Sequence, residues 1–463
     1  MNERIKQRIA IVAVLIAWGG LILWFKLVQL SPYGIEEGAA RALLLGWTLA
    51  DRVINPIVVF GIPDLRALLF APLALYWTGS LLAAKVYTLL ALFGAVLLLH
   101  RWARQTLDDE VALIASGLLL IAPVALMQAD AIGGGVYLLL LFGVGHWIDQ
   151  RVRARGKSLS AWYFVHLIVI AAIVSIHPIG LGYALAMLWH RQRTPVDRAM
   201  QRQMLIGVTL SALFVGLLQA GWTDIQWLSN PITVIGASLL GLPGTGEGIA
   251  WFSGIIALAV LTIVIFRSRK FISGDSLASS LLLATLIGLL CADGGWALIA
   301  TTLLLYVGIL QLIRAQKFGM RGFLAQRGLA TALLFVIAFI FMQGDKTHRE
   351  ILARGDFSPH DRLIETLVHT VDSEQQKAQV ASQWPGRTML ALKQSVWPLP
   401  RATDDDATFL QNTQGLTHLI FDHTDPANVA LARQIAGLSA TLPTSAREAG
   451  GVIISVRRSE TAP

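Results

Sequence analysis

The sequence has little charge and almost no cysteine. Asp, Glu, Lys and Arg make up 14% of its 463 residues, whereas soluble globular proteins average about a quarter. The single cysteine, Cys291, excludes an intramolecular disulfide framework and any zinc motif built on cysteine pairs. No GxGxxG pattern, and no GxxxxGK followed by Ser or Thr, opens a helix in the C-terminal region, so the sequence indicates no nucleotide site there.

Hydrophobic sequence, by contrast, is abundant. Hydrophobic residues make up 55% of the chain and the mean hydropathy is +0.62. Runs long enough to cross a bilayer recur from Ile9 to Met342, after which the composition becomes mixed and charged. The first run follows a basic N-terminus without a small-residue cleavage site, which indicates a retained signal anchor. These features predict a transmembrane domain over 1–343 and a soluble domain over 344–463.

The apolar runs predict a polytopic α-helical membrane protein with about eleven transmembrane helices. The apolar stretch Arg66–Leu82 is predicted to be an interfacial or re-entrant helix in a long first external loop, about 31–81. Counting it as a span would reverse the side of every later loop. The predicted spans run roughly over 9–30, 82–99, 111–128, 132–148, 162–176, 178–190, 204–221, 250–266, 276–291, 295–313 and 328–342.

Basic residues gather in alternate loops between these spans. The intervening loops around Asp130, His177, 222–248 and Asp293 contain no Lys or Arg. By the positive-inside rule, the alternation predicts that the N-terminus lies in the cytoplasm and the C-terminal domain on the opposite, external side of the membrane. The same clustering accounts for the net charge of +8 without a nucleic-acid partner. Three basic residues depart from this alternation, because they lie in the predicted first external loop: Arg41, Arg52 and Arg66.

The C-terminal region is predicted to be a small α/β domain. Hydrophobic spacing and capping residues predict helices, and short apolar runs predict strands. The expected helices are His348–Arg354, Asp361–Asp372 and Pro426–Ala436, and the expected strands are Thr417–Asp422 and Gly451–Arg457.

Several ionisable residues are predicted to lie at the external face of the membrane. Glu36, Glu37, Asp130 and His177 are close to span ends, where a charged group is costly and tends to be functional or paired. A solvated loop acid is the simpler interpretation for each acid taken alone. Their recurrence on successive external turns nevertheless favours a chemical site at this face.

The pair Glu36-Glu37 has two interpretations. One carboxylate is suited to accept a proton from an attacking hydroxyl, and another, together with Asp130, to bind a hard divalent cation beside a phosphate. Arg41 is one helical turn beyond Glu37, where it is placed to bind a phosphate or to pair with the acid. The alternative is structural: the two acids open a helix over Ala39–Leu49 and stabilise its N-terminal dipole.

The order of these elements resembles the GT-C glycosyltransferases, in particular the polyprenyl-phosphate-sugar group that includes protein O-mannosyltransferases and lipid A aminoarabinose transferases. Glu36-Glu37 matches the acidic pair after the first span, although Asp-Glu is usual there. Phe70–Trp77 is similar to the Pro-Pro-Leu segment, with Phe70 in place of the usual Lys and Ala71 in place of the first Pro. Asp130 matches the second acid, and Ser175–Gly180 the His-Pro step.

The resemblance implies a glycosyltransferase at the periplasmic face of a bacterial inner membrane. Its donor would be a polyprenyl monophosphate sugar, transferred with inversion at the anomeric carbon, and its acceptor a lipid, a glycan or a protein. It implies Glu36 or Glu37 as the base and Glu37 with Asp130 as ligands of Mg²⁺, Mn²⁺ or Zn²⁺. Arg41, His177 and Arg66 are then candidates for binding the donor phosphate.

Two alternatives remain open at this stage. Because the motifs are degenerate, one is a non-catalytic subunit with the same fold that presents 344–463 to a protein partner. The other is a lipid or solute transporter. The absence of duplicated halves and the scarcity of charges in mid-span disfavour a transporter.

Overall fold

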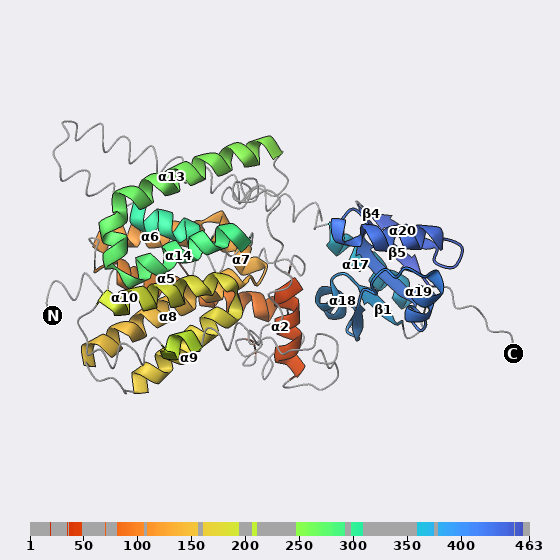
Figure 1. Cartoon of the computed structure of the whole chain (residues 1–463), viewed down its shortest axis with the longest axis horizontal. Helices are drawn as coiled ribbons and strands as arrows, with labels where there is room; N and C mark the ends of the chain where they lie inside the picture. Colours follow the sequence, from red (N-terminus) through yellow and green to blue (C-terminus); the bar gives the residue numbers. More distant parts are fainter. Residues whose placement is uncertain are drawn as a thin grey trace. The chain divides into compact units, whose positions relative to one another are not determined.

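The computed structural model separates into two compact units (Figure 1). The first comprises Met1–Leu30 and Leu82–Glu350, and the second comprises Ser31–Leu81 and Ile351–Pro463. The sequence division at 343/344 assigned 31–81 to the transmembrane domain, whereas the structure groups this segment with the C-terminal region. The structure describes Gly19, Ile35, 37–48, Phe70, 81–105, 109–155, 161–193, 206–210, 247–291, 298–308, 359–374, 378–448 and 450–456.

The described part of the first unit is entirely helical. Helices α8, α9, α10 and α14 lie side by side (Figure 1), and a hydrogen bond between Thr88 and Tyr137 joins α5 to α8. The predictions at 82–99, 162–176, 178–190, 250–266 and 276–291 are confirmed as helices, and those at 9–30 and 328–342 lie outside the described residues. The elements are α5 (Leu81–Ala103), α6 (Asp109–Ile121), α7 (Pro123–Asp130), α8 (Gly134–Arg155), α9 (Ala161–Ile176), η1 (Pro178–Gly180), α10 (Leu181–Arg193), α13 (Glu247–Gly274), α14 (Ser276–Cys291) and a helix at Leu298–Gly308.

One expected span is interrupted. The prediction of a continuous helix over 111–128 was wrong, because α6 ends at Ile121 and α7 begins at Pro123. Proline has no backbone N–H to continue the ladder of a preceding helix, but it suits the first position of a new one. The α7 segment then meets α8 at an angle of 109°.

The length and composition of the described helices agree with a membrane setting only in part. Among the residues that the structure describes, α5 is long and apolar enough to cross a bilayer, and the bent pair α7–α8 would add a second span. Helix α9 and the helices Ser276–Gly288 and Leu298–Gly308 are apolar but shorter. Large apolar side chains are exposed on the outer helices, as expected for contact with lipid. They include Phe164, Ile168, Leu185, Trp189 and Phe266.

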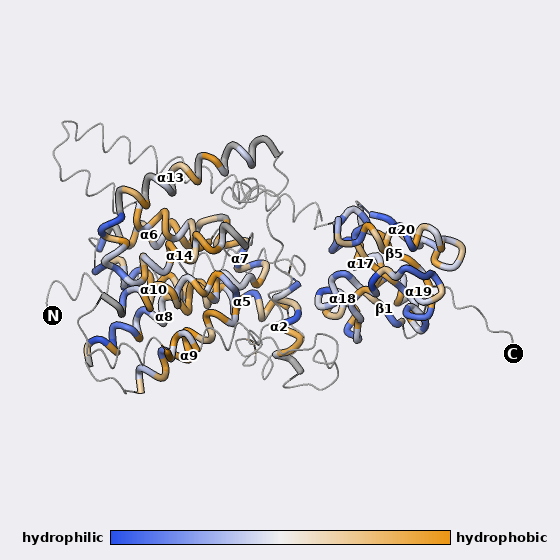
Figure 2. Tube along the Cα trace, viewed as in Figure 1, coloured by the Kyte–Doolittle hydropathy of each residue, from blue (hydrophilic) through white to orange (hydrophobic). Residues whose placement is uncertain are grey.

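Hydrophilic residues of the first unit gather at the end where α8 and α10 finish (Figure 2, left of the view). There the Trp102 Nε1 of α5 donates a hydrogen bond to Asp275, between α13 and α14, at 3.0 Å. The side-chain amides of Gln105 and Gln150 bond the ends of α5 and α8. The described ends of α5 and α8 and the connection between α13 and α14 therefore lie near one another at this end. Its exposed cations include Arg101, Arg151, Arg153, Arg269 and Lys270.

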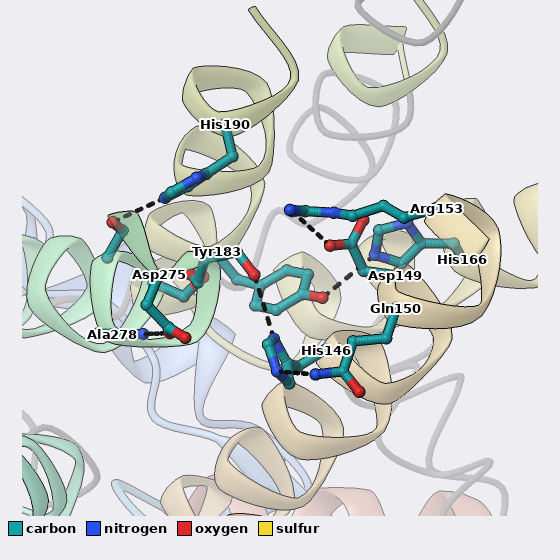
Figure 3. Close-up of polar contacts among 12 residues, drawn as sticks. His146, Asp149, Gln150, Arg153, His166, Tyr183, His190, Asp275 and Ala278 are labelled. Carbon is teal, nitrogen blue, oxygen red and sulfur yellow. Dashed lines mark hydrogen bonds and ion pairs between the residues drawn. The ribbon is translucent and has the colours of Figure 1, made fainter. Parts of the chain in front are cut away.

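Histidines near this basic end form hydrogen bonds between helices (Figure 3). His146 Nδ1 lies 3.1 Å from Ser276 Oγ, and His190 Nε2 lies 3.0 Å from Ser279 Oγ, so both rings contact the first turns of α14. His166 Nε2 lies 3.1 Å from the Tyr183 hydroxyl. Such bonds between helices stabilise packing in an apolar environment. We therefore assign this polar cluster to helix packing.

The second unit is built around a five-stranded sheet in the order β2-β1-β3-β5-β4. Strand β1 is parallel to β2 and β3, whereas β5 is antiparallel to β3 and β4. The strands expected at Thr417–Asp422 and Gly451–Arg457 are confirmed as β3 and β5. The elements are α2 (Glu37–Thr48), α17 (Pro359–Glu374), β1 (Val380–Ser382), α18 (Pro385–Leu392), β2 (Val396–Pro398), α19 (Asp406–Asn412), β3 (His418–Asp422), η3 (Pro426–Asn428), α20 (Val429–Gly437), β4 (Thr444–Glu448) and β5 (Gly451–Ser455).

Alternating residues of the central strands supply two hydrophobic cores. On one face, Val380 and Ile420 pack with α17, α18 and Leu44 of α2. On the other, Leu419 and Phe421 pack with α19 and α20. Side chains of successive strand residues point to opposite faces, so a strand with both faces covered is continuously apolar. Helix α2, which precedes α5 in the chain, thus completes one face of the C-terminal domain.

The contacts of Asp422, at the end of β3, indicate that the stability of this unit depends on pH. Burial acts to raise the pKa of Asp422, but the hydroxyl and N–H of Thr424, at 2.6 and 2.7 Å, and the His360 ring outweigh it and lower the pKa. The stabilisation by this carboxylate is therefore complete above its unfolded pKa of about 3.9 and is lost as the pH falls through the folded pKa.

The variant Asp422→Asn is expected to lower the free energy of unfolding of the second unit by about 1 kcal/mol at pH 6. This difference should shrink below about pH 4, where the native carboxylate also loses its charge. Hydrogen exchange of the β3 and β5 amides, measured at several pH values, checks it. Asp404→Asn, at an exposed position, is the control. An equal difference at pH 3 and pH 6 would contradict the expectation.

Candidate functional site

A buried ion pair lies at the start of α5. The side chain of Lys85 is fully buried, and its Nζ donates a hydrogen bond of 2.9 Å to Oδ1 of Asp130, the last residue of α7. A buried lysine is stable in its charged form only when it is paired, and an ionisable group inside an apolar helix bundle is commonly functional. Asp130 is a predicted site residue. Lys85 is not, although a lysine within an apolar run was the signal that would have identified it.

A strained turn follows Asp130 and redirects the chain into α8. Ile132 has φ +56°, the left-handed region that β-branched residues rarely adopt. That conformation costs roughly 1–2 kcal/mol for a residue with a side chain. The next residue, Gly133, packs against the side chain of Gln128, which an added Cβ would have to displace. The position of Asp130 is thus held by a turn that tolerates little change.

Helix α8 is bonded to α5 just below the ion pair. The hydroxyl groups of Thr88 and Tyr137 lie 2.7 Å apart, one helical turn beyond Lys85. Both residues are buried. Since α5 rises 1.5 Å per residue, Lys85 lies about 25 Å along this helix from Trp102 at the basic end. The Lys85–Asp130 ion pair and the basic cluster, meaning the exposed cations Arg101, Arg151, Arg153, Arg269 and Lys270, are therefore at opposite ends of the first unit.

His177 connects α9 to η1. Its backbone is extended, with φ −161° and ψ 148°, and its Nδ1 accepts a hydrogen bond of 3.2 Å from the N–H of Ile179. Pro178 occupies the first position of the short helix. The ring thus caps η1, and its role as a phosphate partner stays a prediction.

Glu37 is the first residue of α2, and its carboxylate accepts hydrogen bonds from three donors. Oε1 accepts from Arg41 Nε at 2.9 Å and from the N–H of Gly386 at 2.7 Å, and Oε2 accepts from the N–H of Arg387 at 3.0 Å. The last two N–H groups belong to the first turn of α18. Glu37 therefore caps α18 from another part of the chain and pairs with Arg41. Its role as a general base stays a prediction.

The α18 N-terminus is a natural place for an anion. Helix α18 follows β1, where the strand order reverses, and in open α/β sheets ligands bind at this edge. Its first N–H groups and its dipole favour a negative charge. A Cβ on Gly386 would lie 3.0 Å from Glu37 Oε1, so glycine permits the close approach. Burial raises the pKa of Glu37, against the opposing effects of Arg41 and the N–H groups of Arg387 and Gly386.

The predicted metal ligands are each engaged elsewhere. Glu37 is paired with Arg41 in the second unit, and Asp130 with Lys85 in the first. Within the described ranges, no group of three or more His, Cys, Asp or Glu side chains is arranged to hold a metal ion. A divalent ion held by Glu37 and Asp130 stays a prediction. The predicted site residues Glu36 and Arg66 lie outside the described residues.

Sequence comparison relates the chain to no known group: no protein-family model matches it, and no curated protein does. Solved structures do match its fold. ArnT from Cupriavidus metallidurans in the apo state is 11% identical, with 100% of both chains covered and a TM-score of 0.58. The same protein bound to undecaprenyl phosphate is 13% identical, with 99% of both chains covered and a TM-score of 0.56.

An archaeal relative of the fold extends this likeness. The oligosaccharyltransferase AglB from Archaeoglobus fulgidus, in complex with an inhibitory peptide and a dolichol-phosphate, is 13% identical, with a TM-score of 0.53. The match covers 96% of this chain and 74% of AglB. Both proteins are GT-C glycosyltransferases. The chain therefore has a GT-C fold, which is a polytopic membrane fold, and the resemblance seen in the sequence is confirmed at the level of the fold.

Proposed function

We propose that this chain is a membrane glycosyltransferase of the GT-C kind that uses a polyprenyl monophosphate sugar as donor. The acceptor is a lipid, a glycan or a protein hydroxyl at the periplasmic face of a bacterial inner membrane. The full-length likeness to ArnT bound to undecaprenyl phosphate and the likeness to AglB bound to a dolichol-phosphate support the donor class. The proposed topology has about eleven spans with a cytoplasmic N-terminus.

The buried Lys85–Asp130 pair is the observation that carries this proposal. It lies at the end of the first unit opposite the basic cluster, and the positive-inside rule assigns the basic cluster to the cytoplasm. A lysine in a low-dielectric setting attracts a phosphate strongly, and ammonium groups are common phosphate ligands. We infer that the donor phosphate approaches Lys85. Arg41, Arg66 and His177 stay separate candidates for phosphate binding, each taken from the resemblance in sequence.

The transfer itself requires a base and a stabilised leaving group. The acceptor oxygen forms a bond to the anomeric carbon while the bond from that carbon to the phosphate oxygen breaks, with inversion. The acceptor proton passes to Glu36 or Glu37, in the role of a general base. The lipid phosphate departs with the bonding electron pair, and a fixed cation such as Lys85 stabilises the charge that develops there.

A transfer assay tests the proposal directly. The purified chain in nanodiscs is expected to release undecaprenyl phosphate from undecaprenyl-phosphate sugars when an acceptor extract is present. Glu36→Gln with Glu37→Gln should reduce the rate at least a hundredfold, within the range attributed to acid–base catalysis. Lys270→Gln, which removes an exposed cation of α13, is the control. Wild-type chain without release from any hexosyl or pentosyl donor would overturn the proposal.

A second candidate is a non-catalytic GT-C-like subunit that presents 344–463 to a protein partner. The observation in its favour is that Glu37 caps α18 and Asp130 pairs with Lys85, so both described acids have structural partners. Binding of a polyprenyl phosphate without transfer of any sugar would favour this candidate over the enzyme.

A further inference from the structure

In the turn between α7 and α8, the left-handed backbone position is occupied by an isoleucine and not by the glycine that follows it. The N–H groups of Ala131 and Gly133 close the end of α7 on the carbonyls of Met127 and Gln128, at 2.8 and 2.7 Å. Helix ends of this kind place a left-handed residue after the last turn, and that residue is usually glycine. Here it is Ile132, whose side chain is buried, and the glycine follows one position later.

Each residue has a reason to occupy its position. A side chain on Gly133 would displace the Gln128 side chain, which lies against it. Ile132 stays in a disfavoured conformation, which persists only where the surroundings determine the backbone fully. A glycine there would reach many more conformations and would let the turn open. The sequence thus has a stiff residue where the usual choice is a flexible one.

The restricted backbone of Ile132 affects Asp130, which lies two positions earlier. Asp130 ends α7, and its carboxylate meets Lys85 of α5. Helix α8, on the far side of the turn, is bonded to α5 by Tyr137 and Thr88. The angle of 109° between α7 and α8 therefore sets the direction from which Asp130 approaches Lys85.

We propose that Ile132 is a positioning residue for Asp130: its left-handed conformation fixes the α7–α8 turn and thereby holds the Asp130 carboxylate against Lys85. That this geometry serves recognition of a donor phosphate rests on the proposed transferase. The positioning of the ion pair does not depend on that function.

The conformational part is tested by comparing alanine and glycine at two buried isoleucines. Ile148, in the middle of α8, is the matched control. Ile132→Gly is expected to melt at a higher temperature than Ile132→Ala, because glycine adopts a positive φ without cost. Ile148→Gly should melt below Ile148→Ala, because glycine weakens a helix. Glycine below alanine at both positions would overturn the proposal.

The positioning part is tested by a double-mutant cycle. Lys85→Met, Asp130→Asn and their combination are made in the native, Ile132→Gly and Ile148→Gly backgrounds, and thermal unfolding is measured in detergent. The coupling between Lys85 and Asp130, read as the non-additive shift in Tm, is expected to fall by more than about half in the Ile132→Gly background alone. An unchanged coupling in that background would overturn the proposal.

Transfer kinetics separate this inference from the proposed function. Ile132→Gly is expected to lower kcat about tenfold while leaving the donor KM within about twofold, because Lys85 remains to attract the phosphate. Ile148→Gly should change neither. An unaltered kcat in Ile132→Gly would remove the catalytic consequence. A wild-type chain without transfer but with the expected loss of coupling would reject the transferase and support the positioning role.

Discussion

Lys85→Met is expected to lower the free energy of unfolding of the first unit by about 3–5 kcal/mol and to abolish sugar transfer. The substitution leaves the Asp130 carboxylate in an apolar helix bundle without its cation, at a site where only 12% of that side chain is exposed. Removing one member of a buried ion pair is more costly than removing both, because the remaining charge has no compensation. Thermal unfolding in detergent measures the first effect and the donor assay the second.

The double variant Lys85→Met with Asp130→Asn is the matching control. It removes both charges at similar volume, so most of the lost stability should return while transfer stays absent. Lys270→Gln should leave stability within about 0.5 kcal/mol of the native value, as exposed positions do. Native stability in the single variant Lys85→Met would show that Asp130 has another compensating group and that the pair is not the anchor of this site.

Leu44→Ala is expected to destabilise the second unit by about 2–5 kcal/mol. Leu44 belongs to α2, more than 300 residues before the C-terminal domain, yet its buried side chain packs with Leu363 and Val380 of that domain. Shortening it leaves a cavity in that core, and the cost of such a cavity depends on how far the surroundings collapse. Hydrogen exchange should show faster opening of β1 and α17, whereas α8 and α14 keep their protection.

Leu90→Ala provides the comparison for this effect. Leu90 is 51% exposed on α5, so the same truncation there removes less buried surface and should leave hydrogen exchange in the second unit unchanged. Unaltered exchange in β1 and α17 of Leu44→Ala would contradict the assignment of α2 to the core of the C-terminal domain.

The helices and strands that the sequence predicted correctly are those with a strong local pattern. The apolar run over 82–99 and the serine-rich start of 276–291 became α5 and α14, and the apolar alternation after Thr417 became β3. Short elements were missed, such as β1 and α18 with three and eight residues. Elements of that length have too few residues for a period to show. The break at Pro123 was missed because hydropathy does not register a lost backbone donor.

The sequence predicted some residues of the candidate site and missed others. Asp130 was found because it stands at the end of an apolar run, and Glu37 because it forms an acidic pair with its neighbour. Arg41, four residues from Glu37, was named as its possible partner. The distant partners were not found, since Lys85 is 45 residues from Asp130 and the N–H groups that bind Glu37 are about 350 residues away along the chain. No local pattern relates positions so far apart.

By itself, the sequence predicted a polytopic helical membrane chain, a small α/β domain towards its C-terminal end and a resemblance to GT-C enzymes, and the GT-C fold and the α/β sheet are confirmed. Composition, hydropathy and charge alternation depend only on residues that are near one another in the chain, so they can be read from the sequence without a structure. Only the tertiary structure decided that α2 completes the C-terminal domain, that Glu37 caps α18, and that Asp130 meets Lys85 across a strained turn. These depend on which surfaces pack together, and packing is settled by the whole chain at once.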